Sequence, residues 1–117
     1  MLPKLYRLAK DRDIRRVMRL GRPTFGRFLG LKTLPNRLEK SRYCFVISTK
    51  ISKKATKRNL LKRRLREITR LSLLRLVGGY DVVVLTKPNS GILEKTYSEL
   101  ETELSGLLKK GRLFTTK

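Results

Sequence analysis

The residues best suited to chemistry lie in one short segment, residues 54–67, with the sequence KATKRNLLKRRLRE. Seven of its fourteen residues are Lys or Arg, and its one carboxylate, Glu67, stands at the end. Arginine offers a planar pair of donors that matches a phosphate, and lysine offers a point charge. These residue types therefore indicate binding of an anion, above all phosphate.

Helical periodicity divides this segment into two faces. At about 100° per residue, the apolar residues fall on one side and the cations on the other, with Arg64 alone among the apolar residues. The predicted core-facing residues are Leu60, Leu61, Leu65, Ile68 and Leu71. The predicted ligand-binding residues are Arg58, Asn59, Lys62, Arg63, Arg66 and Arg70, preceded by Lys50, Lys53, Lys54 and Lys57. We expect a helix over about residues 54–77 that packs its leucines on a sheet.

The density of charge decides between two interpretations of the cationic face. Runs of exposed charge often serve only to keep a helix in water. Here Arg58, Lys62 and Arg66 follow one another at i, i+4, and each like-charge pair costs roughly a few tenths of a kcal/mol. Few acidic neighbours relieve this repulsion, so an anionic ligand is favoured. The amide of Asn59 suits a ribose hydroxyl or a base edge, but the residue types alone favour an ordinary exposed polar residue at this position.

The charge of the whole chain indicates the class of partner. The 117 residues carry a net charge of +21. Residues 1–80 hold 24 basic and 4 acidic side chains, whereas residues 81–117 hold 6 and 5. Self-repulsion of this size calls for a polyanion, and for a compact basic protein nucleic acid is the leading candidate, with an anionic membrane surface second. The binding surface is therefore expected within the first 80 residues.

Several residue types are missing or rare. The sequence has no His, the usual acid–base catalyst at neutral pH, and one cysteine, Cys44, which cannot form an internal disulfide. Asp11 and Asp13 lie within one turn of each other, but helix capping explains them without a metal. No apolar run approaches the length of a membrane span, and no signal peptide opens the chain. The sequence predicts a soluble, cytoplasmic protein.

The remaining pattern predicts a small α+β sandwich in the order α-β-β-α-β-α. A first helix is expected to begin with Asp11 as its cap and to end at Gly21, with Ile14, Val17 and Met18 on its buried side. The predicted strands are residues 25–34, 43–49 and 80–86, and a last helix is predicted over residues 92–110. The length favours one domain over residues 1–117, with its core in about residues 5–110.

Three motifs in this order resemble the protein component of bacterial ribonuclease P. KRNLLKRRLRE (57–67) is similar to the family's RN-x-x-KR-x-x-R helix, through Arg58, Asn59, Lys62, Arg63 and Arg66. RLAKDRDIRRVMRLG (7–21) resembles the family's opening segment, and GYDVVVLTKP (79–88) resembles its YD strand followed by a basic residue and proline. The resemblance covers most of residues 5–110, and the ordered set is far more specific than the helix motif alone.

The resemblance implies both a fold and a set of sites. It implies a left-handed crossover between the parallel strands that flank the basic helix, whereas sequence alone favours the right-handed form. It implies that the helix motif contacts a catalytic RNA, and that a cleft between the first helix and the sheet binds the single-stranded leader of precursor transfer RNA. Ile14 and Met18 stand where the family usually has phenylalanines, and Lys32 stands where an aromatic is common. Among the aromatic residues, Phe25, Phe28 and Tyr43 are candidates to replace them, although such aromatic residues more often belong to the core.

We therefore expect a non-catalytic, RNA-binding subunit of ribonuclease P. Its partners would be the ribonuclease P RNA and the 5′ leader of precursor transfer RNA, and it would hold no metal or cofactor by itself, with Mg²⁺ bound through the RNA subunit. A structural ribosomal protein is the main alternative, because composition and charge fit it as well. A protein nuclease that acts alone is a third hypothesis. The oligomeric state does not follow from the sequence.

Overall fold

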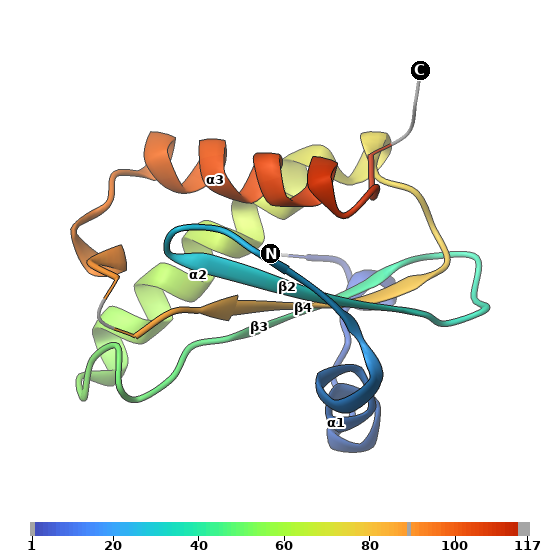
Figure 1. Ribbon diagram of the computed structural model, residues 1–117, viewed down its shortest axis with the longest axis horizontal. Helices are drawn as coiled ribbons and strands as arrows, with labels where there is room; N and C mark the ends of the chain where they lie inside the picture. The colour runs from blue at the N-terminus through green and yellow to red at the C-terminus, as the bar shows by residue number, and fades with distance from the viewer. Residues whose placement is uncertain (1, 89, 115–117) are drawn as a thin grey trace.

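The computed structural model describes residues 2–88 and 90–114, which form a four-stranded sheet with helices on both faces (Figure 1). The strands are β1 (Arg22–Phe25), β2 (Leu29–Pro35), β3 (Arg42–Val46) and β4 (Tyr80–Thr86), in the spatial order β1-β2-β4-β3. The α-helices are α1 (Asp11–Leu20), α2 (Ala55–Ser72) and α3 (Tyr97–Lys110), and 3-10 turns cover Lys4–Tyr6, Leu73–Arg75 and Ile92–Glu94. The predicted α+β class is confirmed.

The sheet is mixed. β1 pairs with β2 and β2 with β4 in antiparallel register, with Leu31 opposite Val84. β3 and β4 are parallel neighbours, with Tyr43 opposite Val82, and the chain between them forms α2. A tight turn cannot join two parallel neighbouring strands, because the chain must return to the end of the sheet at which the first strand began. A longer crossover segment is therefore needed. The β3-α2-β4 unit therefore fixes α2 against the sheet.

The larger core lies between the sheet and the pair α2 and α3, above the sheet in Figure 1. Alternate residues of a strand point to opposite faces, and on this face the strands supply Leu29, Leu31, Tyr43, Phe45, Val82 and Val84. The helices contribute Leu61, Leu65 and Ile68 from α2 and Leu100, Leu104 and Leu108 from α3. This layer holds most of the buried apolar side chains among the described residues.

A smaller cluster lies on the other face, under α1. Val17 of α1 and Val83 of β4 are fully buried there together with Leu8. Ile14, Met18, Leu34, Cys44 and Leu85 pack around them and are half-buried. One helix of ten residues cannot cover the whole face, and part of it stays open.

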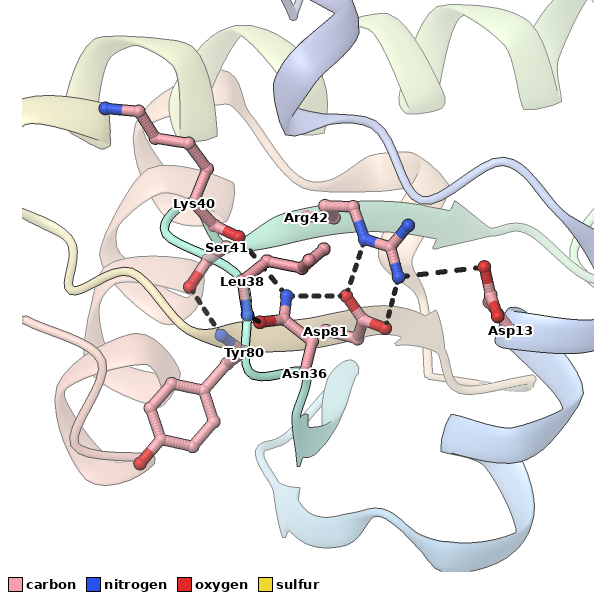
Figure 2. Close-up of polar contacts among 8 residues, drawn as sticks. All are labelled: Asp13, Asn36, Leu38, Lys40, Ser41, Arg42, Tyr80 and Asp81. Atoms are coloured by element: carbon pink, nitrogen blue, oxygen red, sulfur yellow. Dashed lines mark hydrogen bonds and ion pairs between the residues drawn. The ribbon is translucent and has the colours of Figure 1, made fainter.

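A polar network ties α1 to the sheet (Figure 2). Arg42 of β3 donates from Nε and Nη2 to the two carboxylate oxygens of Asp81 on β4, at 2.9 and 2.8 Å. Asn36 Nδ2 donates to Asp81 Oδ1 at 2.9 Å, and Arg42 Nη2 lies 3.6 Å from Asp13 Oδ2 on α1. The hydrogen bond to Asp81 raises the pKa of Arg42. The buried carboxylate of Asp81 thus joins β4 to β3 and to Asn36, and Arg42 extends the network to α1.

The prediction of one continuous strand over residues 25–34 is wrong, because the structure forms the β1–β2 hairpin there. The turn is held by groups that are remote in sequence. Glu103 of α3 accepts hydrogen bonds from the backbone N–H groups of Arg27, Phe28 and Leu29 at 3.0, 2.8 and 2.7 Å. Lys87 Nζ donates to the carbonyl of Gly26 at 2.6 Å. These hydrogen bonds satisfy polar backbone groups of the turn, which therefore need no partner in a neighbouring strand.

The other boundaries agree with the sequence to within a few residues, and β4 has the predicted bounds. Lys10, and not Asp11, is the cap residue of α1, and Asp11 is the first helical residue. Regular α-helix in α2 ends at Ser72, well before residue 77, and β3 ends at Val46. α3 begins at Tyr97, after a capping box in which Thr96 Oγ1 accepts from the N–H of Glu99 while Glu99 Oε1 accepts from the N–H of Thr96.

Candidate nucleic-acid interface

The basic helix α2 packs on the larger core along a narrower stripe than predicted. Leu61, Leu65 and Ile68 are buried as expected, but Leu60 and Leu71 remain 45% and 57% exposed. The buried stripe continues through Thr69 and Ser72 instead; Thr69 Oγ1 is satisfied by the carbonyl of Leu65 at 3.0 Å. The contact stripe is therefore rotated toward the cationic side of the helix.

This rotation sorts the predicted ligand-binding residues into two rows. Arg58, Lys62 and Arg66 lie at the border of the buried stripe and are half-buried. The other predicted residues of the face, Asn59, Arg63 and Arg70, are exposed. Long cationic side chains can bury their stems and keep their charge in water. The inner row is thereby held against the protein while the outer row faces solvent.

The inner row also borders the α1 side of the sheet. Cys44 alternates on β3 with Tyr43 and Phe45, which point into the larger core, so its thiol points to the α1 side. Burial raises the pKa of the Cys44 thiol, and the positive charges of Lys62 and Arg66 act to lower it. These two cations are therefore near enough to act on the Cys44 thiol.

The hydrogen bonds of the cationic face differ from residue to residue. Arg58 Nη1 donates to the carbonyl of Ser52 at 2.7 Å, which holds the loop that enters the helix. Arg70 donates to both carboxylate oxygens of Glu67 at 2.8 and 2.6 Å, and these bonds lower the pKa of Glu67. Within residues 2–88 and 90–114, Lys62, Arg63 and Arg66 have no ion pair or side-chain hydrogen bond. Three of the predicted cations are thus available to a ligand, whereas Arg70 must first leave Glu67.

The four predicted lysines lie in and just before the first turn of α2, and all are exposed: Lys50, Lys53, Lys54 and Lys57. Lys54 is the cap residue, and its N–H is bonded to Ser52 Oγ at 3.1 Å. The first turn contains no acidic residue. The positive end of the helix dipole repels cations at the helix N-terminus. An anion bound there would be attracted by the dipole and would also reduce the repulsion among the lysines.

The structure brings the three predicted cleft residues together on the α1 side of the sheet. Ile14 and Met18 are neighbours on α1, and Lys32 Nζ donates to the carbonyl of Met18 at 2.6 Å. This bond satisfies an acceptor at the C-terminal end of α1, where a cation is favoured. Lys32 therefore positions the end of α1 in addition to contributing positive charge.

Of the three candidate aromatic residues, only Phe25 is accessible. Phe28 and Tyr43 are buried in the larger core, whereas Phe25 is 56% exposed. Its ring covers Gly30, where an added Cβ would lie 3.1 Å from Phe25 Cδ1. Lys87 Nζ lies 5.3 Å from the centre of the ring, within range of a cation–π contact. The sequence analysis did not single out Lys87, although it is the basic residue of the KP pair after β4.

The comparison with known families now decides the assignment. The family model described as Ribonuclease P matches residues 2–112. The chain belongs to the ribonuclease P protein family. This confirms the predicted function: the chain is the protein subunit of ribonuclease P, acting with the catalytic RNA subunit in the 5′ processing of transfer RNA. The ribosomal alternative and the lone nuclease are left without support.

Curated relatives and solved structures agree with this assignment. The chain is 35% identical over 117 residues to the ribonuclease P protein component of Caldanaerobacter subterraneus subsp. tengcongensis, covering 100% of this chain and 98% of the relative. It is 34% identical over 110 residues to that of Chloroflexus aurantiacus, covering 94% and 80%. The ribonuclease P protein of Thermotoga maritima superposes with a TM-score of 0.81 at 28% identity, over 89% of this chain and 96% of that one. That of Staphylococcus aureus, at 23% identity, shows the same fold, with a TM-score of 0.85 over 94% and 98%.

Proposed function

We propose that the cationic face of α2 binds the RNA subunit of ribonuclease P. Its contact residues are Arg58, Asn59, Lys62, Arg63, Arg66 and Arg70, with Lys50, Lys53, Lys54 and Lys57 at the start of the helix. The observation that carries the proposal is the set of cations Lys62, Arg63 and Arg66, which have no partner among the described residues although Leu61, Leu65 and Ile68 fix the helix from behind. A rigid helix that presents free guanidinium groups suits a phosphate backbone.

We propose further that the open part of the α1 side of the sheet binds the 5′ leader of precursor transfer RNA. Ile14 and Met18 form its apolar wall on α1, and Lys32 and Lys87 supply positive charge. Phe25 is the exposed aromatic surface on which an unpaired base can stack, a role that the residues of α1 do not offer in this chain. Stacking of this kind contributes about 1–3 kcal/mol per base.

The hydrolysis itself is assigned to Mg²⁺ ions held by the RNA. The carboxylates of Asp81 and Glu103 accept hydrogen bonds from this chain and serve its fold, which fits a protein that supplies charge and not metal ligands. By screening phosphate repulsion between the two RNAs, the protein should lower the Mg²⁺ concentration that cleavage requires. Cleavage of precursor transfer RNA by the RNA subunit across a Mg²⁺ titration, with and without protein, measures this effect. We propose that residues 1–117 form one RNA-binding domain, which acts in the cytoplasm.

The salt dependence of binding tests the α2 surface directly. If about six phosphates are contacted, the logarithm of the binding constant for the RNA subunit should fall with the logarithm of salt concentration at a slope of roughly −4 to −5. Arg63→Ala and Arg66→Ala should each reduce the magnitude of that slope by about one. Lys109→Ala, at the exposed end of α3, is the matched control and should leave it unchanged. An unaltered slope in both arginine variants would refute the proposed surface.

A further inference from the structure

A second cationic face lies on α1, and the proposed function does not use it. The outer side of this helix carries Arg12, Arg15, Arg16 and Arg19. Their spacing of i, i+3, i+4 and i+7 places all four on one side of the helix. All four are exposed, and together with Asp11 they line a shallow hollow on the surface.

These arginines are poorly neutralised by the protein itself. Asp11 lies 3.9 Å from Arg15, but the two side chains are 85% and 83% exposed, and ion pairs this exposed contribute little. Asp13, the other acidic residue of α1, faces Arg42 on the sheet. In the part of the chain that the structure describes, Arg12, Arg16 and Arg19 have no ion pair or side-chain hydrogen bond. Four like charges within about two helical turns oppose folding, which indicates a ligand.

The direction of this face separates it from the cations of α2. The apolar side of α1, centred on Val17, lies on the sheet, so the arginines on the opposite side of the helix point away from it. In Figure 1, α1 lies below the sheet and α3 above it, and α2 packs on the same face of the sheet as α3. The cations of α2 lie on a helix that packs against the other face of the sheet, through Leu61, Leu65 and Ile68. An RNA segment that lies along α2 is therefore not the segment that the arginines of α1 meet.

The chemistry of the face favours a phosphodiester chain over a membrane surface. Helices that bind membranes insert an apolar side into the lipid, and the apolar side of α1 packs on the sheet instead, with Val17 fully covered. The ten residues of α1 extend over about 15 Å, with neighbouring arginines about 5–6 Å apart. A row of bidentate donors at this spacing suits successive phosphates of one strand.

We infer that the outer face of α1 is a second RNA-binding surface, which holds the phosphate backbone of an RNA segment distinct from the one on α2. This inference rests on the proposed function and extends it: the protein joins two RNA segments, one along α2 and one on the outer face of α1. The four arginines contribute charge and no sequence preference, because phosphate contacts position an RNA without reading its bases.

The test compares two double variants with equal loss of charge. Arg12→Gln with Arg16→Gln removes two cations from α1, and Lys109→Gln with Lys110→Gln removes two exposed cations from α3. Glutamine is a good helix former, so circular dichroism should show the same helix content in all proteins. Binding to the RNA subunit is measured against salt concentration, and the contacts are mapped by hydroxyl-radical footprinting with Arg63→Ala in parallel.

The α1 variant should reduce the magnitude of the salt slope by about 1.4–1.8, the share of two phosphate contacts. It should also lose protection over RNA positions that Arg63→Ala leaves protected, while the α3 variant behaves as the unaltered protein. An unchanged slope in the α1 variant, an equal change in the α3 variant, or loss of protection at the positions affected by Arg63→Ala would each overturn the inference.

Two further outcomes separate the alternatives. Vesicles of phosphatidylserine and phosphatidylcholine serve as the membrane probe; binding to them that is lost in the α1 variant, with RNA binding unchanged, would assign the face to a membrane and overturn the inference. If Arg63→Ala alters the slope and the footprint while the α1 variant does not, the proposed function stands and this inference fails. If neither alters them, both are refuted.

Discussion

The two faces of the sheet are supplied by alternate residues of the same strands, and they differ in almost every property. The face under α2 and α3 presents Leu31, Tyr43 and Val84 to a continuous apolar core. The face under α1 presents Lys32, Arg42 and Cys44, packs a small cluster around Val17, and stays partly open. The first face has the composition of a scaffold, and the second combines cations, one exposed aromatic ring and limited packing.

The difference indicates that one side of the sheet mainly stabilises the fold and that the other side mainly serves binding. Burial of apolar area stabilises the fold in proportion to the area removed from water, and most of that area lies on the α2–α3 side. The α1 side is held instead by a few directed contacts, among them Arg42 with Asp81 and Lys32 with Met18. Substitutions on the two sides should therefore affect different measurements.

The largest effect is expected from Leu65→Asp, on the scaffold side. Leu65 is fully buried between α2 and the sheet, and a carboxylate there would have no partner. We expect the free energy of unfolding to fall by at least about 4 kcal/mol, as measured by urea denaturation. Leu71→Asp makes the same change at an exposed position of the same helix and should cost less than about 1 kcal/mol. Equal losses in the two variants would contradict the assignment of the buried stripe.

Asp81→Asn tests the link between the sheet and α1. The variant keeps the shape of the side chain but leaves the partly buried Arg42 with only the more distant Asp13 as a carboxylate partner. We expect a loss of about 3 kcal/mol in unfolding free energy, since removal of one partner from a buried ion pair is costly. Glu67→Gln breaks an exposed ion pair and should change stability by less than about 1 kcal/mol. Similar values for both variants would show that the buried network is no stronger than a surface pair.

Tyr43 gives the scaffold side a sensitivity to alkaline pH. Burial raises the pKa of Tyr43 from its ordinary value of 10.0 to about 12. The folded state thus retains a proton that the unfolded state loses, so this contribution is complete below pH 10 and disappears as the pH rises toward 12. The loss should be about 3 kcal/mol, visible in urea denaturation at a series of pH values. Tyr43→Phe should remove this part of the pH dependence; an identical dependence in the variant would contradict it.

Phe25→Ala should have the smallest effect, and it should appear in binding alone. The ring is mostly exposed, so the unfolding free energy should change by less than about 1 kcal/mol. Affinity for precursor transfer RNA with its leader should fall by about 1 kcal/mol, the lower part of the range for base stacking, while affinity for mature transfer RNA stays constant. A loss shared by both RNAs would place Phe25 outside the leader site. Phe28→Ala, at a buried position, should instead destabilise the fold.

Local patterns in the sequence predicted the elements whose cause is local. β4 has the predicted bounds because YDVVVLT is a continuous run of strand-forming residues between a glycine pair and a proline. The cationic face of α2 follows from helical spacing, and its opposite face is buried at Leu61, Leu65 and Ile68 as predicted. The left-handed sense of the crossover stays a prediction from the family resemblance, whereas the sequence pattern alone favours the right-handed form.

The features that the sequence analysis missed depend on residues far apart in the chain. The β1–β2 turn is fixed by Glu103, more than 70 positions later, and no pattern within residues 25–34 indicates it. Leu60 and Leu71 were predicted as core because a helical wheel does not show how α2 rotates to bury Thr69 and Ser72. The exposure of Phe25 depends on its position over Gly30 in the neighbouring strand. Each is a property of tertiary contacts and not of local sequence.

The hydrogen bonds of Glu103 constrain the order in which parts of the chain can fold during synthesis on the ribosome. The hairpin that carries Phe25 is among the first parts of the chain to be synthesised, yet its turn lacks its acceptors until residue 103 has been added. Chains emerge from their N-terminal end at a limited rate, so the rim of the proposed leader site is completed only after the last helix leaves the exit tunnel. A fragment released before residue 103 is added would therefore carry most of the cationic residues but would lack the contacts that complete the proposed leader site.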